Sequence, residues 1–171
     1  KICYYQTSFM NKMQVPLVNL VANYNGIKSE IDRAIAKVVA SGSFILNDVV
    51  ADFESQFATY CDSNYSVGVA SGTDALYLSL LALDVKKGDE VIVPSNTYIA
   101  SALAVSYTGA KPVLVEPKLE TYNIDPSRIE AAITSKTKAI MPVHLYGQCC
   151  EMEVIMQIAA KHNLFVVEDN A

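Results

Sequence analysis

The chain has 171 residues, of which 51% are hydrophobic and 18% are charged. This composition predicts a folded domain with a full core and excludes a disordered chain. The formal net charge is -5 and the sequence pI is about 5.0. An acidic chain of this kind argues against a general binder of nucleic acid or of an anionic membrane surface, although a local site for one phosphorylated ligand stays open.

The apolar segments and the cysteines set the expected compartment. No apolar run is long enough to span a bilayer, and the first residues lack a signal-peptide pattern. The four cysteines form no C-x-x-C pair, and the chain has only two histidines, so a Cys/His metal site is not expected. We therefore expect a cytoplasmic protein with reduced thiols, no membrane contact and no bound metal.

The N-terminal third predicts two helices. Residues 1–14 carry little pattern, and we expect an irregular extension there. Apolar residues recur at helical spacing from Ile27 and stop at the Ser41–Gly42 pair, which ends the first helix. A second helix is expected from about Asp48 to Tyr60. The Phe44–Leu46 segment between them is expected to be an exposed loop that reaches a partner or the substrate.

From residue 66 onward, short apolar strands alternate with helices. The expected strands are 66–70, 90–93, 112–115, 139–143 and 164–167, and the expected helices are 74–83, 99–107, 126–133 and 151–162. Such alternation predicts an α/β fold, in which a mostly parallel sheet is flanked by helices on both faces in three layers. In this fold, ligands bind beyond the carboxyl ends of the strands.

The end of the first expected strand has the features of an anion site. Ser71, Gly72, Thr73 and Asp74 follow residues 66–70 directly, and a helix pattern starts at once. The first amides of a helix lack intrahelical partners, and the helix dipole adds positive charge there, so a phosphate fits. Gly72 permits close approach of the backbone, and Thr73 is the expected cap.

Other strand ends add different chemistry at the same edge of the sheet. Tyr98 can stack on a flat ring, Asp169 can pair with a basic ring nitrogen, and His144 supplies an imidazole. A ligand that combines a phosphate, a flat ring and a basic ring nitrogen would use this set. Pyridoxal phosphate is such a ligand, because a carboxylate that keeps its ring nitrogen protonated makes the ring an electron sink.

Each of these residues also has an ordinary structural explanation. Tyr98 fits a core position at a helix start, His144 fits a hydrogen-bonded structural role, and Asp169 fits a helix N-cap. A hydrolase with Ser71 as nucleophile and His144 as base is a weaker alternative, because Ser71 stands one place late for the G-x-S-x-G elbow. The dinucleotide and nucleoside-triphosphate glycine motifs are absent from the sequence.

Seven stretches, in order and with matching spacing, resemble the DegT/DnrJ/EryC1/StrS family of sugar aminotransferases, within the aspartate-aminotransferase-like, fold-type I group. They are residues 41–45, 53–58, 71–76, 88–101, 109–113, 142–148 and 167–171. The resemblance covers about residue 15 to the end. It implies that residues 15–171 are the N-terminal part of a pyridoxal-phosphate-binding large domain.

The resemblance also assigns roles to single residues. The amides of Thr73 and Asp74, with the Thr73 hydroxyl, would hold the cofactor phosphate. Tyr98 would stack on the pyridine ring, and Asp169 would act as the catalytic partner of the ring nitrogen. The residues expected to bind pyridoxal 5'-phosphate are Gly72, Thr73, Asp74, Tyr98, His144 and Asp169.

The family's Schiff-base lysine is not matched in this chain, since family members carry it some tens of residues after the aspartate. The resemblance therefore implies that this segment alone is inactive. It implies that the intact protein is a homodimer that transfers an amino group, from glutamate as donor, to a nucleotide-linked keto-sugar in polysaccharide or antibiotic sugar biosynthesis. Two alternatives stay open: a pyridoxal-phosphate-dependent sugar dehydratase, with another residue in place of the lysine, and a non-catalytic binding or regulatory module.

Overall fold

The structure is a computed structural model that describes Pro16 and residues 18–171. The chain divides into two compact units, residues 1–66 (the N-terminal unit) and residues 67–171 (the C-terminal unit). The extension expected over residues 1–14 lies outside the described residues. None of the described helices combines the length and the hydropathy that crossing a bilayer requires.

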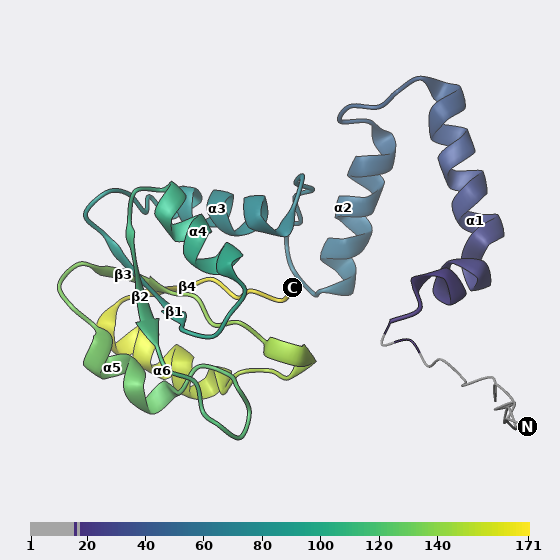
Figure 1. Cartoon of the computed structure of the whole chain (residues 1–171). Helices are drawn as coiled ribbons and strands as arrows, with labels where there is room; N and C mark the ends of the chain where they lie inside the picture. Colours follow the sequence, from purple (N-terminus) through teal and green to yellow (C-terminus); the bar gives the residue numbers. More distant parts are fainter. Residues whose placement is uncertain (1–15, 17) are drawn as a thin grey trace, which may run out of the picture. The chain divides into compact units, whose positions relative to one another are not determined.

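The N-terminal unit contains helices α1 (Leu20–Ser41) and α2 (Asp48–Tyr60) (Figure 1). The predicted bounds of α2 are confirmed, and Asn47 caps its first turn. Helix α1 begins earlier than the predicted Ile27, because the Asn19 side chain accepts a hydrogen bond from the third amide that follows it. Capping by a single side chain thus extends the helix beyond the stretch that hydrophobic spacing marks.

Apolar side chains remain exposed on the N-terminal unit. The Phe44–Leu46 loop is exposed, as predicted, after the left-handed Gly42 that ends α1. A groove between the two helices is lined by Ile35, Val39 and Phe53, among others. Within this unit, the two helices do not bury all of each other's apolar side chains. Exposed apolar surface of this kind is typical of a protein–protein interface.

The C-terminal unit is built on a four-stranded sheet with the strand order β2-β1-β3-β4. Every pair of neighbours is parallel, with β1 paired to both β2 and β3, and β3 paired to β4. The strands are β1 (Glu90–Pro94), β2 (Lys111–Val115), β3 (Thr137–Ile140) and β4 (Phe165–Val166). Parallel pairing confirms the predicted sheet and aligns all four carboxyl ends at one edge.

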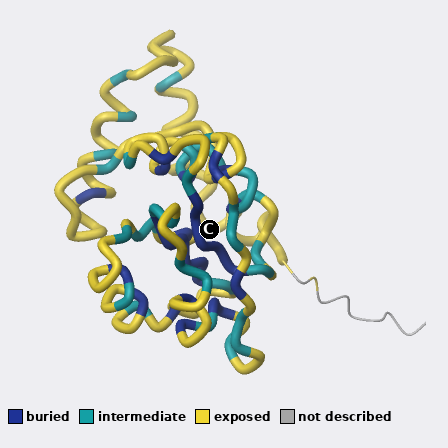
Figure 2. Tube along the Cα trace, turned by 90° about the vertical axis from the view of Figure 1, so that its left-hand side faces the viewer, coloured by how far each residue is buried: buried dark blue, intermediate teal, exposed yellow. Residues whose placement is uncertain are grey.

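Helices cover both faces of this sheet (Figure 1). Leu76 and Leu80 of α3 pack with α4 residues against one face, whereas Ile129 of α5 and Ile155 of α6 pack against the other. Residues of the central strand β1 are buried throughout, and Figure 2 shows the buried residues gathered along the sheet. The helices are α3 (Gly72–Ala82), α4 (Ile99–Tyr107), α5 (Pro126–Ala132) and α6 (Met152–His162), with a short 3₁₀ helix η1 (Leu145–Gly147). The predicted three-layer α/β arrangement is therefore confirmed.

The strand predicted over residues 66–70 is absent from the described sheet. Val67 and Val69 in this segment are exposed, and the structure assigns no strand there. Apolar, β-branched residues favour a strand because they pack well on a sheet. A strand also needs a neighbouring strand with which to form backbone hydrogen bonds. The described four-strand order places no such neighbour beside this segment.

Substitution of Ile140 tests the packing of the sheet. Ile140 pairs with Ile92 and Val166 on the neighbouring strands and is fully buried, so Ile140→Ala should lower the free energy of unfolding by about 2–5 kcal/mol. Leu114→Ala on β2, where Leu114 is 59% exposed, is the control and should cost at most about 1 kcal/mol. Urea denaturation of the full-length protein measures both, and equal losses would contradict this packing.

Candidate functional site

The carboxyl edge of the sheet contains a pocket of about 240 Å³ in the C-terminal unit. Its walls come from the start of α3, from the turn that precedes α4 and from the segments that follow β3 and β4. Four of the residues predicted from the sequence line it together: Gly72, Thr73, Tyr98 and Asp169. The predicted convergence is therefore observed for these four residues, although the segment that precedes Gly72 and Thr73 is not a strand in the described structure.

Ser71, and not Thr73, caps helix α3. The Ser71 hydroxyl accepts a hydrogen bond from the Asp74 amide at 3.1 Å and donates one to the Asp74 carboxylate at 2.9 Å. Ser71 is extended, whereas Thr73 is already the second helical residue, so the predicted Thr73 cap is wrong. The first intrahelical bond runs from the Ala75 amide to the Ser71 carbonyl. Consequently the amides of Gly72 and Thr73 remain at the open end of the helix, beside the Thr73 hydroxyl.

Asp74 does not line the pocket, although the sequence predicted it among the cofactor residues. Its amide and its carboxylate are both engaged with Ser71 in the cap. Anion binding by the Asp74 amide therefore stays a prediction.

Gly72 contributes open space to the pocket. Its φ is not in the left-handed region, so the backbone does not require glycine there. A Cβ atom at this position would meet no atom of the described residues within 4 Å. Because Gly72 lines the pocket, the missing side chain leaves room next to the open helix end.

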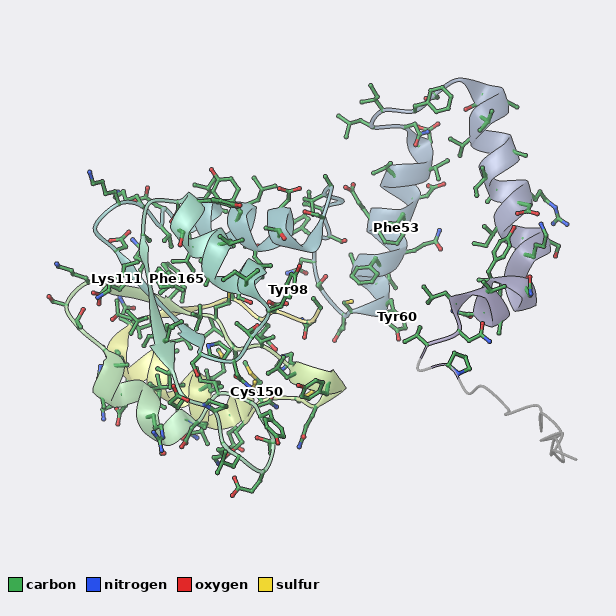
Figure 3. The ribbon with its side chains drawn as sticks, viewed as in Figure 1. Phe53, Tyr60, Tyr98, Lys111, Cys150 and Phe165 are labelled. Atoms are coloured by element: carbon green, nitrogen blue, oxygen red, sulfur yellow. The ribbon has the colours of Figure 1, made fainter. Side chains whose placement is uncertain are left out.

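Tyr98 directly precedes α4 and is 79% exposed (Figure 3). The alternative explanation of Tyr98 as a core residue is therefore wrong. Because its ring lies at the pocket and is not packed into the core, the ring face is available to stack on a planar ligand.

Asp169 presents a buried carboxylate to the pocket, and the residue is only 7% exposed. The Ser101 hydroxyl donates to Oδ2 at 2.9 Å, and the Ala171 amide donates to Oδ1 at 3.1 Å. The backbone of Asp169 is bonded to Pro142 and His144 across the extension of β3 and β4. Among the described residues no lysine or arginine forms an ion pair with Asp169. A buried carboxylate of this kind favours a cation or a protonated base beside it.

His144 is not among the residues that line the pocket, and both of its ring nitrogens are engaged. The Cys150 amide donates to Nδ1 at 3.0 Å, so the neutral ring carries its proton on Nε2, which lies 2.9 Å from a Glu168 carboxylate oxygen. The Ser71 hydroxyl is likewise committed to Asp74. The structure shows no hydrogen bond between Ser71 and His144, and both groups are engaged by other partners, which argues against the hydrolase alternative.

Two hydroxyl residues that the sequence analysis did not single out complete the surroundings of Asp169. Ser101 is fully buried in α4, and the Thr97 Oγ1 atom lies 3.1 Å from its Oγ atom. Their spacing from Tyr98, one residue before and three after, places them at the same helix end. A serine in an otherwise apolar helix start was the available signal, but a hydrophobic pattern does not indicate which polar group a serine contacts.

The described residues contain no group of three or more His, Cys, Asp or Glu side chains arranged to hold a metal ion. Cys150 is buried, with its thiol 3.2 Å from the Val143 carbonyl, and burial raises the pKa of this thiol to about 11. Cys61 and Cys149 are exposed free cysteines.

The three cysteines of the described residues, Cys61, Cys149 and Cys150, should differ sharply in alkylation. At pH 8 a thiol pKa near 11 leaves a thiolate fraction about a hundredfold smaller than an ordinary thiol has, and only the thiolate reacts. Peptide mapping by mass spectrometry after brief iodoacetamide treatment should find Cys61 and Cys149 modified and Cys150 unmodified. Denaturation before alkylation is the control and should make all three react. Fast labelling of Cys150 in the native protein would show that it is not buried.

Comparison with known proteins gives the same family over most of the chain. The sequence profile of the DegT/DnrJ/EryC1/StrS aminotransferase family matches residues 25–171. The dTDP-3-amino-3,6-dideoxy-alpha-D-galactopyranose transaminase of Aneurinibacillus thermoaerophilus is 57% identical over 157 residues, which cover 92% of this chain and 43% of that protein. This chain therefore spans less than half the length of that relative.

Two solved structures are similar in fold as well as in sequence. The crystal structure of Streptomyces venezuelae DesV superposes with a TM-score of 0.90 at 49% identity, over 91% of this chain and 42% of that one. The structure of Bacillus subtilis NtdA, with its cofactor PMP (pyridoxamine phosphate) bound, gives a TM-score of 0.87 at 39% identity, over 91% of this chain and 36% of that one.

Proposed function

Because the chain belongs to the DegT/DnrJ/EryC1/StrS aminotransferase family, we propose that the full-length protein is a pyridoxal-phosphate-dependent aminotransferase. It transfers an amino group from an amino acid, glutamate in this proposal, to a nucleotide-linked keto-sugar. The observation that carries the proposal is one pocket that combines an open helix end, an exposed aromatic ring and a buried carboxylate without a basic partner among the described residues.

The phosphate end of the cofactor fits the start of α3. The amides of Gly72 and Thr73 lie at the positive end of the helix dipole, and the Thr73 hydroxyl is not used by the cap. The space left by the missing side chain of Gly72 admits the phosphate close to these donors. In this proposal Gly72 and Thr73 bind and orient the phosphate.

The ring end fits Tyr98 and Asp169. Tyr98 stacks on the ring face, and the Asp169 carboxylate holds a proton on the ring nitrogen, since a buried anion stabilises the charged form of a neighbouring base. When bound, pyridoxal phosphate supplies an electron-withdrawing ring that stabilises negative charge on the substrate carbon. His144 supports this end through its backbone bond to Asp169, and a contact of its ring with the cofactor stays a prediction.

The substrate and the partner are part of the same proposal. The relative from Aneurinibacillus thermoaerophilus is named as a transaminase of a dTDP-linked amino sugar, which supports a nucleotide-linked sugar as substrate. The exposed apolar residues of the Phe44–Leu46 loop and of the α1–α2 groove support a second copy of the protein as partner. The free cysteines of the described chain are consistent with a cytoplasmic enzyme.

Gly72→Ala tests the phosphate end. The new methyl group meets no described protein atom but occupies pocket space, so the affinity for pyridoxal phosphate should fall roughly tenfold while thermal stability stays level or rises. Gly26→Ala in α1, where a Cβ also meets nothing within 4 Å, is the matched control and should leave cofactor affinity unchanged. Equal affinity in both variants and the wild type, measured by absorbance titration, would contradict this placement of the phosphate.

Reaction of the full-length protein with an amino donor tests the function itself. The purified protein should be yellow with cofactor and should bleach when glutamate is added. Absence of any spectral change with any amino donor would contradict the aminotransferase proposal. Bleaching followed by loss of water from the nucleotide-sugar, without an amino-sugar product, would point to the dehydratase alternative.

Asp169→Asn tests the ring-nitrogen partner. Asparagine keeps the shape of the side chain but cannot supply the charge, so the rate of the reaction with glutamate should fall by roughly a hundredfold or more. Circular dichroism and the unfolding midpoint should show that the fold persists. Near-normal turnover would mean that Asp169 has only a structural role.

A further inference from the structure

The Asp169 carboxylate accepts a hydrogen bond from the Ser101 hydroxyl, which the Thr97 hydroxyl contacts in turn. The proposed function gives neither hydroxyl a role. Ser101 lies in α4, is fully buried, and donates its hydroxyl to Asp169 Oδ2 at 2.9 Å. Thr97 lies just before α4, with its hydroxyl oxygen 3.1 Å from that of Ser101. These contacts bring together residues that are 68 positions apart in the chain.

The chemistry of these groups fixes the direction of the hydrogen bonds. An ionised carboxylate can only accept, so the single hydroxyl proton of Ser101 is committed to Asp169. The Ser101 oxygen can then only accept from Thr97, although the Thr97–Ser101 distance alone allows either donor. The chain therefore runs in one direction, from Thr97 to Ser101 to Asp169, and each bond polarises the next.

A helical serine has a simpler way to satisfy its hydroxyl. Ser106, in the same helix, bonds to the carbonyl of Ala102, four residues earlier, at 2.9 Å. Ser101 instead directs its proton out of the helix to a carboxylate. The contrast shows that helix geometry alone does not explain the Ser101 contact.

We propose that Ser101, supported by Thr97, is a positioning residue that holds the Asp169 carboxylate in the orientation required by the cofactor's ring nitrogen. The proposal rests on the proposed function. With Oδ2 bonded to Ser101 and Oδ1 bonded to the Ala171 amide, rotation of the carboxylate is opposed at both oxygens. A carboxylate that is fixed before the ligand arrives loses less conformational freedom on binding.

The test is a matched pair of substitutions in the full-length protein. Threonine and valine have nearly the same shape, but only threonine keeps the hydroxyl, so Ser101→Thr and Ser101→Val share any effect of the added bulk. The dissociation constant for pyridoxal phosphate should rise about tenfold more in Ser101→Val than in Ser101→Thr, because a hydrogen bond to a charged group is lost. Ser106→Ala is the control in the same helix and should leave the constant unchanged.

A second pair keeps the test decisive if bulk at the buried Ser101 position impairs folding. At half-buried Thr97, Thr97→Val should weaken cofactor binding and slow bleaching by glutamate by a smaller factor than Ser101→Val, and Thr97→Ser should restore both.

Equal cofactor affinity of the valine and hydroxyl variants at both positions would overturn the proposal. Failure of the wild-type protein to bind pyridoxal phosphate would overturn the proposed function and this inference with it. If the wild-type protein binds pyridoxal phosphate and the valine variants bind it equally well, the inference alone would be overturned.

Discussion

A buried carboxylate is the constraint on which the site depends. Asp169 is removed from water, forms no ion pair with a basic side chain among the described residues, and must be stabilised by oriented donors. One donor is the amide of Ala171, two residues later, and the other is Ser101 of α4. The bridge between Val143 and Asp169 continues the β3–β4 pairing past the ends of both strands and fixes the backbone of Asp169. The parallel sheet, the helix α4 and the pocket are thus linked through a single side chain.

Much of the fold follows from hydrophobic spacing. The alternation of apolar strands and helices predicted the parallel sheet, and the approximate bounds predicted for α2 and α4 agree with those observed. The prediction failed where the structure of a segment depends on a neighbouring strand or on a capping residue, and not on its own hydrophobic pattern. Residues 66–70 have strand composition but no described neighbour in the sheet, and α1 starts at the capping residue Asn19, which hydrophobic spacing does not mark.

The site was predictable in position and less so in detail. Strand ends in a parallel sheet converge, which is why Gly72, Tyr98 and Asp169 were expected together and lie on one pocket. Ser71 and Asp74 have the spacing of a capping box ahead of an apolar run, which was an available signal for the Ser71 cap. No such signal indicates that both ring nitrogens of His144 are engaged by other groups. Hydrogen-bond partners that are distant in the sequence, such as Ser101 and Asp169, are settled by tertiary geometry, which spacing along the chain does not encode.

The start of α4 has an evolutionary consequence. Tyr98 directly precedes α4 and Ser101 lies in its first turn. A shift of this helix start would therefore move both the aromatic ring at the pocket and the hydroxyl bonded to Asp169. A lineage that altered one of these properties by moving the backbone would alter the other as well. The position of the ring and the hydrogen bond to Asp169 could change independently only through side-chain substitutions. We therefore expect residues 97, 98, 101 and 169 to covary among related proteins, while the number of residues between 97 and 101 stays constant.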